Sequence, residues 1–205
     1  MTTKRLAVIS AGLSQPSSTR LLADRLTEAT VTELEDRGLT ATVETFELRD
    51  VAHEIINAML TGFPSGDLRA VLESVTGADG LIAVTPVFTT SYSGLFKSFI
   101  DIVDKDALTG MPVLLGATGG TSRHSLALEY SMRPLFTYLH ADVARTSVFA
   151  ATDDWSGAPD DANPLPARIR RAGRELAELV AAQEAAGPSD LYANTPSFDE
   201  MLNQL

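Results

Sequence analysis

Five short apolar runs alternate along the chain with longer segments in which apolar residues recur at helical spacing. Such alternation predicts a parallel β-sheet with helices packed on both of its faces. The second run alternates apolar and polar residues, as an edge strand partly open to water does, whereas the first, third and fourth are almost wholly apolar and should be central strands. The runs occupy residues 6–11, 41–48, 80–85, 113–118 and 144–150.

An α/β chain of this kind most often forms a three-layer sandwich around a five-stranded parallel sheet with the strand order 2-1-3-4-5. In that order, ligands bind outside the carboxyl ends of the strands, near the switch point between the first and third strands. Residues 49–62 fit either a short helix or a flap over this site. Helical periodicity predicts further helices at residues 19–37, 65–76, 93–104, 125–140 and 166–186.

The junction between the third strand and the following helix is the most informative segment. Pro86 has no amide hydrogen for the sheet ladder, so we expect the strand to end at Thr85. The backbone groups of residues 87–90 would then be free to bind the polar edge of a flat ring, before Ser91 or Ser93 caps the next helix. An ordinary strand-to-helix loop is the alternative.

Residues 10–20 follow the first strand and are rich in serine and threonine at the point where a helix begins. A helix N-terminus carries unpaired amides and partial positive charge, so a phosphate monoester fits there, with Arg20 as a charged donor. A capped polar turn is the alternative, although capping needs only one hydroxyl. The chain has neither the Gly-Lys-Ser/Thr of a Walker loop nor a Gly-x-Gly-x-x-Gly dinucleotide motif.

Residues 118–120, Thr-Gly-Gly, follow the fourth strand, and the two glycines allow a ligand to approach the backbone closely. His124 or Arg123 could bond the carbonyl edge of a ring or a nucleotide phosphate; a glycine turn with a polar cap is the alternative. Because strands 1, 3 and 4 are neighbours in the expected order, the loops that follow them should line one crevice.

These segments resemble the NADPH-dependent FMN reductase family, of flavodoxin-like fold, over residues 4 to about 180. The matching residues are 10–22, then 85–88 with 91–97 and 99–101, then 118–120 with His124 and 133–134. The sequence as a whole most resembles the subgroup that supplies reduced flavin to luciferase-like monooxygenases. The resemblance implies FMN phosphate on Ser14, Ser18, Thr19 and Arg20, the ring edge on Pro86, Val87, Phe88 and Thr89, and one side of the ring near Gly119 and Gly120, with Ser10, Thr118 and His124 in the same cofactor-binding set.

The resemblance further implies an NAD(P)H-dependent FMN reductase that passes a hydride from NADPH to FMN and supplies reduced flavin to a two-component monooxygenase. Hydride moves directly between stacked rings, so no catalytic acid or base is expected. Lys97, Arg20 and Arg123 are candidates for the NADPH phosphates, and each could equally be a solvated surface charge. Alternatives are a quinone or azo-compound reductase, a flavodoxin-type electron carrier, and a regulatory domain that binds a phosphorylated metabolite.

Length, charge and composition limit the number of domains and the kinds of partner that the protein can have. The 205 residues fit one domain, residues 1–187, followed by a tail, residues 188–205. The net charge of -11 opposes nucleic-acid binding, and the absence of cysteine excludes disulfides and thiolate metal sites and suits a cytoplasmic protein. The aspartates of residues 150–166 do not match the calcium-loop spacing, so no metal site is expected. No segment has the apolar length of a membrane span.

Two apolar stripes predict contacts beyond a single chain. The first is wider than one sheet face needs and predicts a homodimer; it comprises Tyr92, Leu95, Phe96, Phe99, Ile100 and Val103. The resemblance implies dimers or tetramers whose neighbours complete the flavin site, with Trp155 or Phe88 contributing. The second stripe, in the tail, is expected to hold a neighbouring subunit rather than a monooxygenase; it comprises Phe198, Met201, Leu202 and Leu205.

Overall fold

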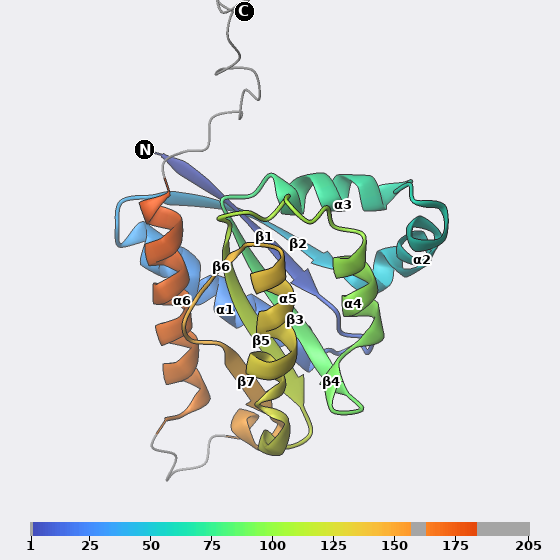
Figure 1. Ribbon diagram of the computed structural model, residues 1–205. Helices are drawn as coiled ribbons and strands as arrows, with labels where there is room; N and C mark the ends of the chain where they lie inside the picture. Colours follow the sequence, from blue (N-terminus) through green and yellow to red (C-terminus); the bar gives the residue numbers. More distant parts are fainter. Residues whose placement is uncertain (1, 157–162, 184–205) are drawn as a thin grey trace, which may run out of the picture.

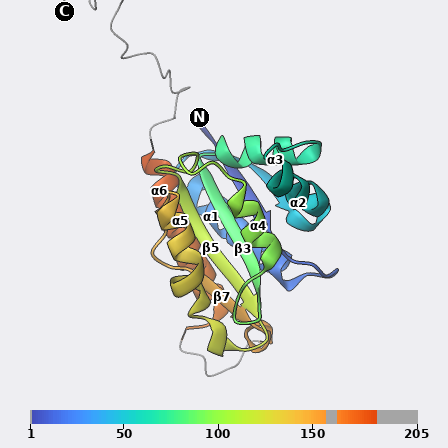
Figure 2. The same ribbon diagram turned by 45° about the vertical axis from the view of Figure 1, so that its right-hand side comes forward.

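The computed structural model describes residues 2–156 and 163–183, whose strands form one sheet with helices on both faces (Figures 1 and 2). The strands are β1 (Thr3–Ser10), β2 (Thr40–Glu47), β3 (Gly80–Phe88), β4 (Ser91–Tyr92), β5 (Pro112–Gly119), β6 (Asp142–Val143) and β7 (Val148–Ala151). The α-helices are α1 (Ser18–Glu35), α2 (Ala52–Thr61), α3 (Asp67–Thr76), α4 (Gly94–Asp101), α5 (Arg133–Tyr138) and α6 (Leu165–Ala182). Short helical turns are η1 (Leu48–Val51), η2 (Ser122–His124), η3 (Leu128–Met132) and η4 (Thr152–Trp155).

The predicted strand order is confirmed, although the described residues form a sheet of seven strands and not the predicted five. The sheet runs β2-β1-β3-β5, and β6 and β7 both pair with β5 on its far side, all in parallel. With β6 and β7 as two pieces of the fifth strand, this is the order 2-1-3-4-5 of flavodoxin-like sheets. As predicted, β2 lies at an edge, and β1, β3 and β5 are central.

The fifth strand is interrupted because side chains bind the backbone groups that would otherwise form its ladder. The amide of Thr146 donates to Glu175 of α6 at 2.6 Å, and its hydroxyl bonds the same carboxylate at 2.8 Å. Arg133 donates to the carbonyls of Ala144 at 3.1 Å and Arg145 at 3.2 Å. The amide of Ala144 still donates to Val113 of β5 at 2.8 Å, and residues 145–147 then leave the sheet before β7 begins.

Two apolar clusters fill the space on either side of the sheet. One joins alternate residues of β1 and β3 to α1 and α6, and the other joins the intervening residues to α2, α3, α4 and α5. This alternation follows from the two-residue period of a strand, which points successive side chains to opposite faces. The buried strands of the sheet thus contribute side chains to both clusters, and because the strands are parallel, their carboxyl ends lie at the same edge of the sheet.

The predicted helices occur with shifted ends, except for the predicted helix at 125–140, which is wrong as a single element. The chain there forms the 3₁₀ turn η2, the π turn η3 and only then α5. Pro134 has no amide to bond the carbonyl four residues back, and the amide of Arg133 instead bonds Leu128, five residues back. Residues 49–62 form η1 and α2, which is the helix alternative.

Most of the apolar stripe of α4 packs within its own chain, so the width of the stripe by itself does not indicate a subunit contact. Phe96 and Phe99 are fully buried, and Tyr92 and Leu95 are half-buried against the same cluster. Figure 1 shows α4 lying over the sheet between α2 and α5. A homodimer remains a prediction without support from this stripe.

The tail stripe and the proposed boundary at residue 187 lie outside the described residues, as does part of the acidic loop. Within residues 2–156 and 163–183, none of the helices has the length and apolar character to cross a membrane. In the same part of the chain, no group of three or more acidic or histidine side chains is arranged to hold a metal ion.

We expect Gly173→Ala to destabilise the protein, because α1 and α6 meet at this glycine. A Cβ at this position would lie 2.8 Å from the Cβ of Ala29 and 2.9 Å from the amide nitrogen of Thr30. Overpacking costs about 1–3 kcal/mol, which exceeds the ~1 kcal/mol gain in helix propensity. Urea unfolding followed by circular dichroism measures the change. Gly94→Ala is the control, because a Cβ there meets nothing within 4 Å and should be neutral or stabilising.

Candidate active site

A cavity of about 470 Å³ lies at the edge of the sheet where β1, β3, β5 and β7 end. The size is typical of small-molecule sites, which span roughly 300–1,000 Å³. The loops after β1, β3 and β5 share it, as the strand order predicts. Its described lining comprises Gly12, Leu13, Ser14, Ser18, Thr19, Pro86, Val87, Phe88, Thr118, Gly119, Gly120, Ala150, Thr152 and Trp155. The predicted residues Ser10, Arg20, Thr89 and His124 are outside this lining.

One wall of the cavity is the serine loop, residues 12–17, and the first turn of α1. Ser17 is the N-cap of α1, and its hydroxyl accepts the amide of Arg20 at 3.2 Å. The other first-turn amides have no carbonyl partner within the helix, so they are available to an anion. A Cβ on Gly12 would lie 2.2 Å from the Ser17 hydroxyl, which explains why the chain carries glycine where it enters the loop.

Three of the predicted hydroxyls, those of Thr19, Thr118 and Ser10, are buried within the protein. Thr19 Oγ1 and Thr118 Oγ1 form a buried hydrogen bond of 2.9 Å, which ties the first turn of α1 to the end of β5. Ser10 is fully buried, and its hydroxyl has no hydrogen-bond partner among the described residues. The hydroxyls of the exposed residues Ser14 and Ser18 are therefore the ones that the serine loop and α1 present to the cavity.

The predicted end of the third strand at Thr85 is wrong. β3 continues to Phe88, and the chain returns as β4 in an antiparallel hairpin, with Val87 opposite Tyr92 and Phe88 opposite Ser91. Pro86 lacks a donor but pairs in register with Thr118 of β5 at the rim of the sheet, where proline is tolerated. Residues 87 and 88 are thus held in a strand and do not form a free loop.

Thr89 and Thr90 form the two-residue turn of this hairpin, with φ of 47° and 75°. Positive φ at both positions suits the tight hairpin turns in which Asn-Gly is preferred, and it strains β-branched side chains. The base of the hairpin is fixed, since the amide of Ser93 donates to Thr85 Oγ1 at 3.0 Å. Ser93 is also the N-cap of α4, as one of the two predicted alternatives, and accepts the amide of Phe96 at 3.2 Å.

The glycine loop, residues 118–121, forms the opposite wall. A Cβ on Gly119 would lie 2.9 Å from the ring of Phe149, whereas one on Gly120 would meet nothing within 4 Å. Gly119 therefore allows close packing on β7, and Gly120 leaves open backbone at the cavity. Arg123 is exposed and His124 half-buried on the adjoining turn η2.

Sequence reasoning missed Ala150 and Thr152 and assigned Trp155 to a neighbouring subunit. All three line the cavity of their own chain, because β7 ends at the same edge as the central strands. The guanidinium of Arg25 lies 6.0 Å from the centre of the Trp155 ring, close enough for a cation–π contact. The rule that ligands bind at carboxyl ends, applied to the fifth run, would have found these residues.

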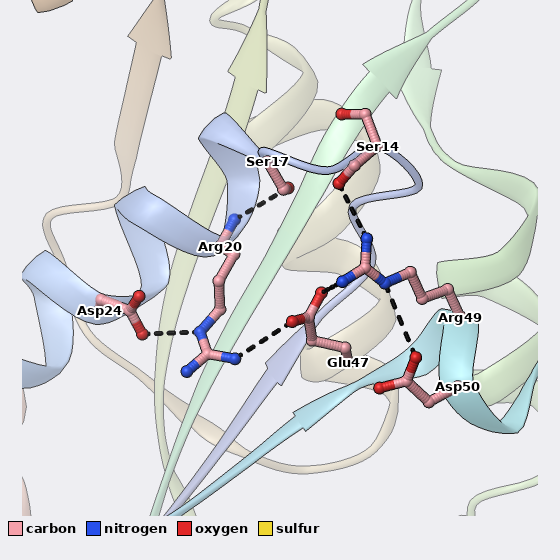
Figure 3. A network of polar contacts seen from close by, with 7 residues as sticks. All are labelled: Ser14, Ser17, Arg20, Asp24, Glu47, Arg49 and Asp50. Carbon is pink, nitrogen blue, oxygen red and sulfur yellow. Dashed lines mark hydrogen bonds and ion pairs between the residues drawn. The ribbon is translucent and has the colours of Figure 1, made fainter.

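Two of the three predicted cations, Arg20 and Lys97, are engaged with carboxylates. Arg20 bonds Asp24 at 2.7 Å and Glu47 at 3.2 Å, and the hydrogen bond to Asp24 raises the pKa of its guanidinium (Figure 3). Lys97 pairs with Asp101 at 2.5 Å. Neither side chain lines the cavity, so an anion there meets hydroxyls and backbone amides.

Comparison with known proteins decides the family. The model of the NADPH-dependent FMN reductase family matches residues 4–156, which is most of the chain. The chain belongs to this family. An FMN reductase (NADPH) of Pseudomonas aeruginosa is 36% identical over 175 residues, which cover 85% of this chain and 91% of that relative. The NADH-dependent FMN reductase SfnE of Pseudomonas putida is 36% identical over 180 residues, covering 88% and 94%.

A solved structure shares the fold of this chain. An oxidoreductase from Corynebacterium diphtheriae matches with a TM-score of 0.85 and 46% identity, covering 90% of this chain and all of that one. The flavodoxin-like arrangement of this FMN reductase family member is therefore shared with that oxidoreductase.

Replacing the strained turn by Asn-Gly, in the double variant T89N/T90G, should stabilise the protein by about 1–2 kcal/mol, because each left-handed L-residue costs roughly that amount and glycine offsets part of the gain through its flexibility. Urea unfolding measures the change. The variant T89A/T90A keeps a Cβ at both positive-φ positions and should recover only a small part. Equal stability of all three proteins would contradict the assignment of strain to this turn.

Proposed function

We propose that the chain is an NAD(P)H-dependent FMN reductase and that the cavity binds FMN. In this proposal, the phosphate of FMN lies at the serine loop, and the flavin ring lies between the hairpin and the glycine loop. One observation carries the proposal. A helix N-terminus with free amides, a hairpin wall and an open glycine backbone meet in a single cavity at the switch point of the sheet.

The donors present suit a phosphate monoester with a flat ring. Ser14 and Ser18 supply hydroxyls beside the first turn of α1, where the helix dipole favours an anion. Val87 and Phe88 supply backbone and an aromatic face, and Phe88 is 46% exposed. Gly120 offers backbone that no side chain covers. The described residues thus fit FMN without the Arg20 contact that the sequence predicts.

Bound FMN supplies the hydride-accepting ring, and the protein binds and orients it. The described lining consists of glycine, hydroxyl, aliphatic and aromatic residues, with Trp155 and Phe88 as the aromatic ones. Direct transfer between stacked rings requires orientation and exclusion of water more than proton transfer by a side chain. These side chains would hold the flavin ring in place and leave one of its faces accessible to the nicotinamide.

The names of the relatives extend the proposal to electron donor and acceptor. One relative is described as using NADPH and another NADH, so both nucleotides are candidate donors for this chain. We propose that reduced FMN leaves the site to supply a two-component monooxygenase. We further propose that residues 1–187 form the reductase domain and that a homodimer or tetramer is the working assembly. A quinone or azo-compound reductase and an electron carrier are the alternatives.

The test mixes purified protein with FMN and follows oxidation of NADPH, and separately of NADH, under air. Oxidation that continues with FMN in large excess supports a reductase that releases its product. Tight FMN binding without oxidation would support the carrier instead. Faster turnover with a quinone or azo dye than with free FMN would favour the quinone or azo-compound reductase. Lack of FMN binding would contradict all three of these flavin-dependent functions.

Ser18→Asp tests the phosphate site directly. An aspartate in the first turn suits the helix dipole, so stability should be kept, while a new anion beside the site repels a phosphate by roughly 1–4 kcal/mol depending on exposure. The KM for FMN should rise by about fivefold or more, and that for riboflavin, which lacks the phosphate, should stay unchanged. Ser18→Ala is the control for loss of the hydroxyl. Equal rises for both flavins would place the phosphate elsewhere.

A further inference from the structure

A chain of ion pairs connects the serine loop to two other elements (Figure 3). Arg49, in η1 directly after β2, donates from Nη1 to the carbonyl of Ser14 at 2.8 Å. Its Nη2 lies 2.6 Å from Glu47 Oε2, an ion-pair contact. Glu47 Oε1 in turn accepts from Arg20 of α1 at 3.2 Å. Loop, strand end and helix are therefore joined through one carboxylate.

The bond from Arg49 holds a segment that has little else to hold it. Among the described residues, it is the one hydrogen bond that joins loop residues 12–16 to the rest of the chain. The side chains of Arg49 and Glu47 are each 16% exposed, so this pair is better shielded than the others of the network. The bond to Ser14 is itself exposed, but it is charge-assisted, and its donor is held in place by the better shielded contact with Glu47.

The direction of the bond matters for an anion. In a planar trans peptide, the carbonyl and the next amide point in opposite directions. With the Ser14 carbonyl turned to Arg49, the amide of Gln15 faces away from Arg49, and the carbonyl dipole, which would repel a phosphate, is already engaged. Arg49 itself is outside the cavity lining.

We propose that Arg49 is a positioning residue that presets the serine loop for the phosphate of FMN, and so sets the preference of the enzyme for FMN over riboflavin. The inference rests on the proposed function, since it assigns the phosphate to this loop. Arg49 acts through the loop and not through its charge, because the carboxylates of Glu47 at 2.6 Å and Asp50 at 3.7 Å balance the positive charge of its guanidinium. It does not contact the flavin.

The experiment measures dissociation constants of FMN and riboflavin, from the quenching of their fluorescence, for the wild-type protein and Arg49→Met. The charged hydrogen bond lost in the variant predicts FMN affinity weaker by about tenfold, with riboflavin affinity and kcat on riboflavin unchanged. Arg49→Lys keeps the charge but lacks the planar fork that spans Ser14 and Glu47, so it should recover only part of the FMN affinity. This variant also serves if Arg49→Met does not fold.

Arg37→Met is the matched control. Arg37 likewise bonds a backbone carbonyl and two carboxylates, at Glu33 and Glu178, but it lies at the other end of α1. Its loss removes the same charge and should leave the affinity ratio of the two flavins unchanged. The salt dependence of FMN binding should be the same in wild type and Arg49→Met, whereas direct contact with the phosphate would reduce it.

The outcomes separate this inference from the proposed function. An unchanged FMN-to-riboflavin ratio in folded Arg49→Met, or equal weakening of both flavins, overturns the positioning role while wild-type reductase activity stands. A lower salt dependence in the variant overturns it in favour of direct contact. Wild-type protein that binds neither flavin overturns the proposed function itself, and with it the premise of this inference.

Discussion

The parallel register of β1, β3 and β5 is the constraint on which the site depends. Ser10 lies beside Val84, and Pro86 beside Thr118, so the three chains leave the sheet at nearly the same level. Parallel pairing gives each of these strands the same direction, which brings loops distant in sequence to one edge. The buried hydrogen bond between Thr19 and Thr118 then fixes the first turn of α1 against β5. Small changes in this register would separate the serine loop from the glycine loop.

The net charge of -11 repels an anionic ligand such as FMN, so local groups must compensate for this repulsion at the binding site. The cations near the serine loop do not offset this charge at the cavity, because Arg20 and Arg49 are each bound to carboxylates. Local dipoles take their place, since helix amides and hydroxyls are strong donors at short range even where the long-range field is unfavourable. The acidic surface thus affects the approach of an anionic ligand more than its binding once it is in place.

The sequence predicts those parts of the fold that hydrophobic periodicity controls. The central strands, the edge position of β2 and the convergence of three loops all follow from short apolar runs and the direction of parallel strands. It fails where particular side chains compete for the backbone. The break after β6 depends on Glu175 and Arg133, which are distant in sequence from one another, and the extension of β3 past Pro86 depends on pairing with a strand of two residues.

Site prediction has a similar limit. An arginine in the first turn of a helix near a phosphate loop has the right chemistry, but its partners decide its direction, and Glu47 comes from another strand. Arg49 was missed for the same reason, since it acts through a bond from its side chain to a loop carbonyl 35 positions earlier. Sequence pattern identifies the donors available; which of them face the ligand is settled by tertiary ion pairs.

The interruption of the fifth strand also affects the tendency of the protein to aggregate through the edges of its sheet. An edge strand exposes unpaired backbone groups that can recruit strands from other molecules, and continuous edges are prone to aggregation. On this side, Arg133 and Glu175 bind backbone groups of residues 144–146, so only the short strands β6 and β7 are left for a strand of another molecule to pair with. On the opposite side, the longer β2 carries the exposed Glu44, whose carboxylate accepts a hydrogen bond from Ser74 of α3 and whose charge opposes pairing with a strand of another molecule. The two edges of the sheet are thus protected by different means, one by interruption and the other by charge.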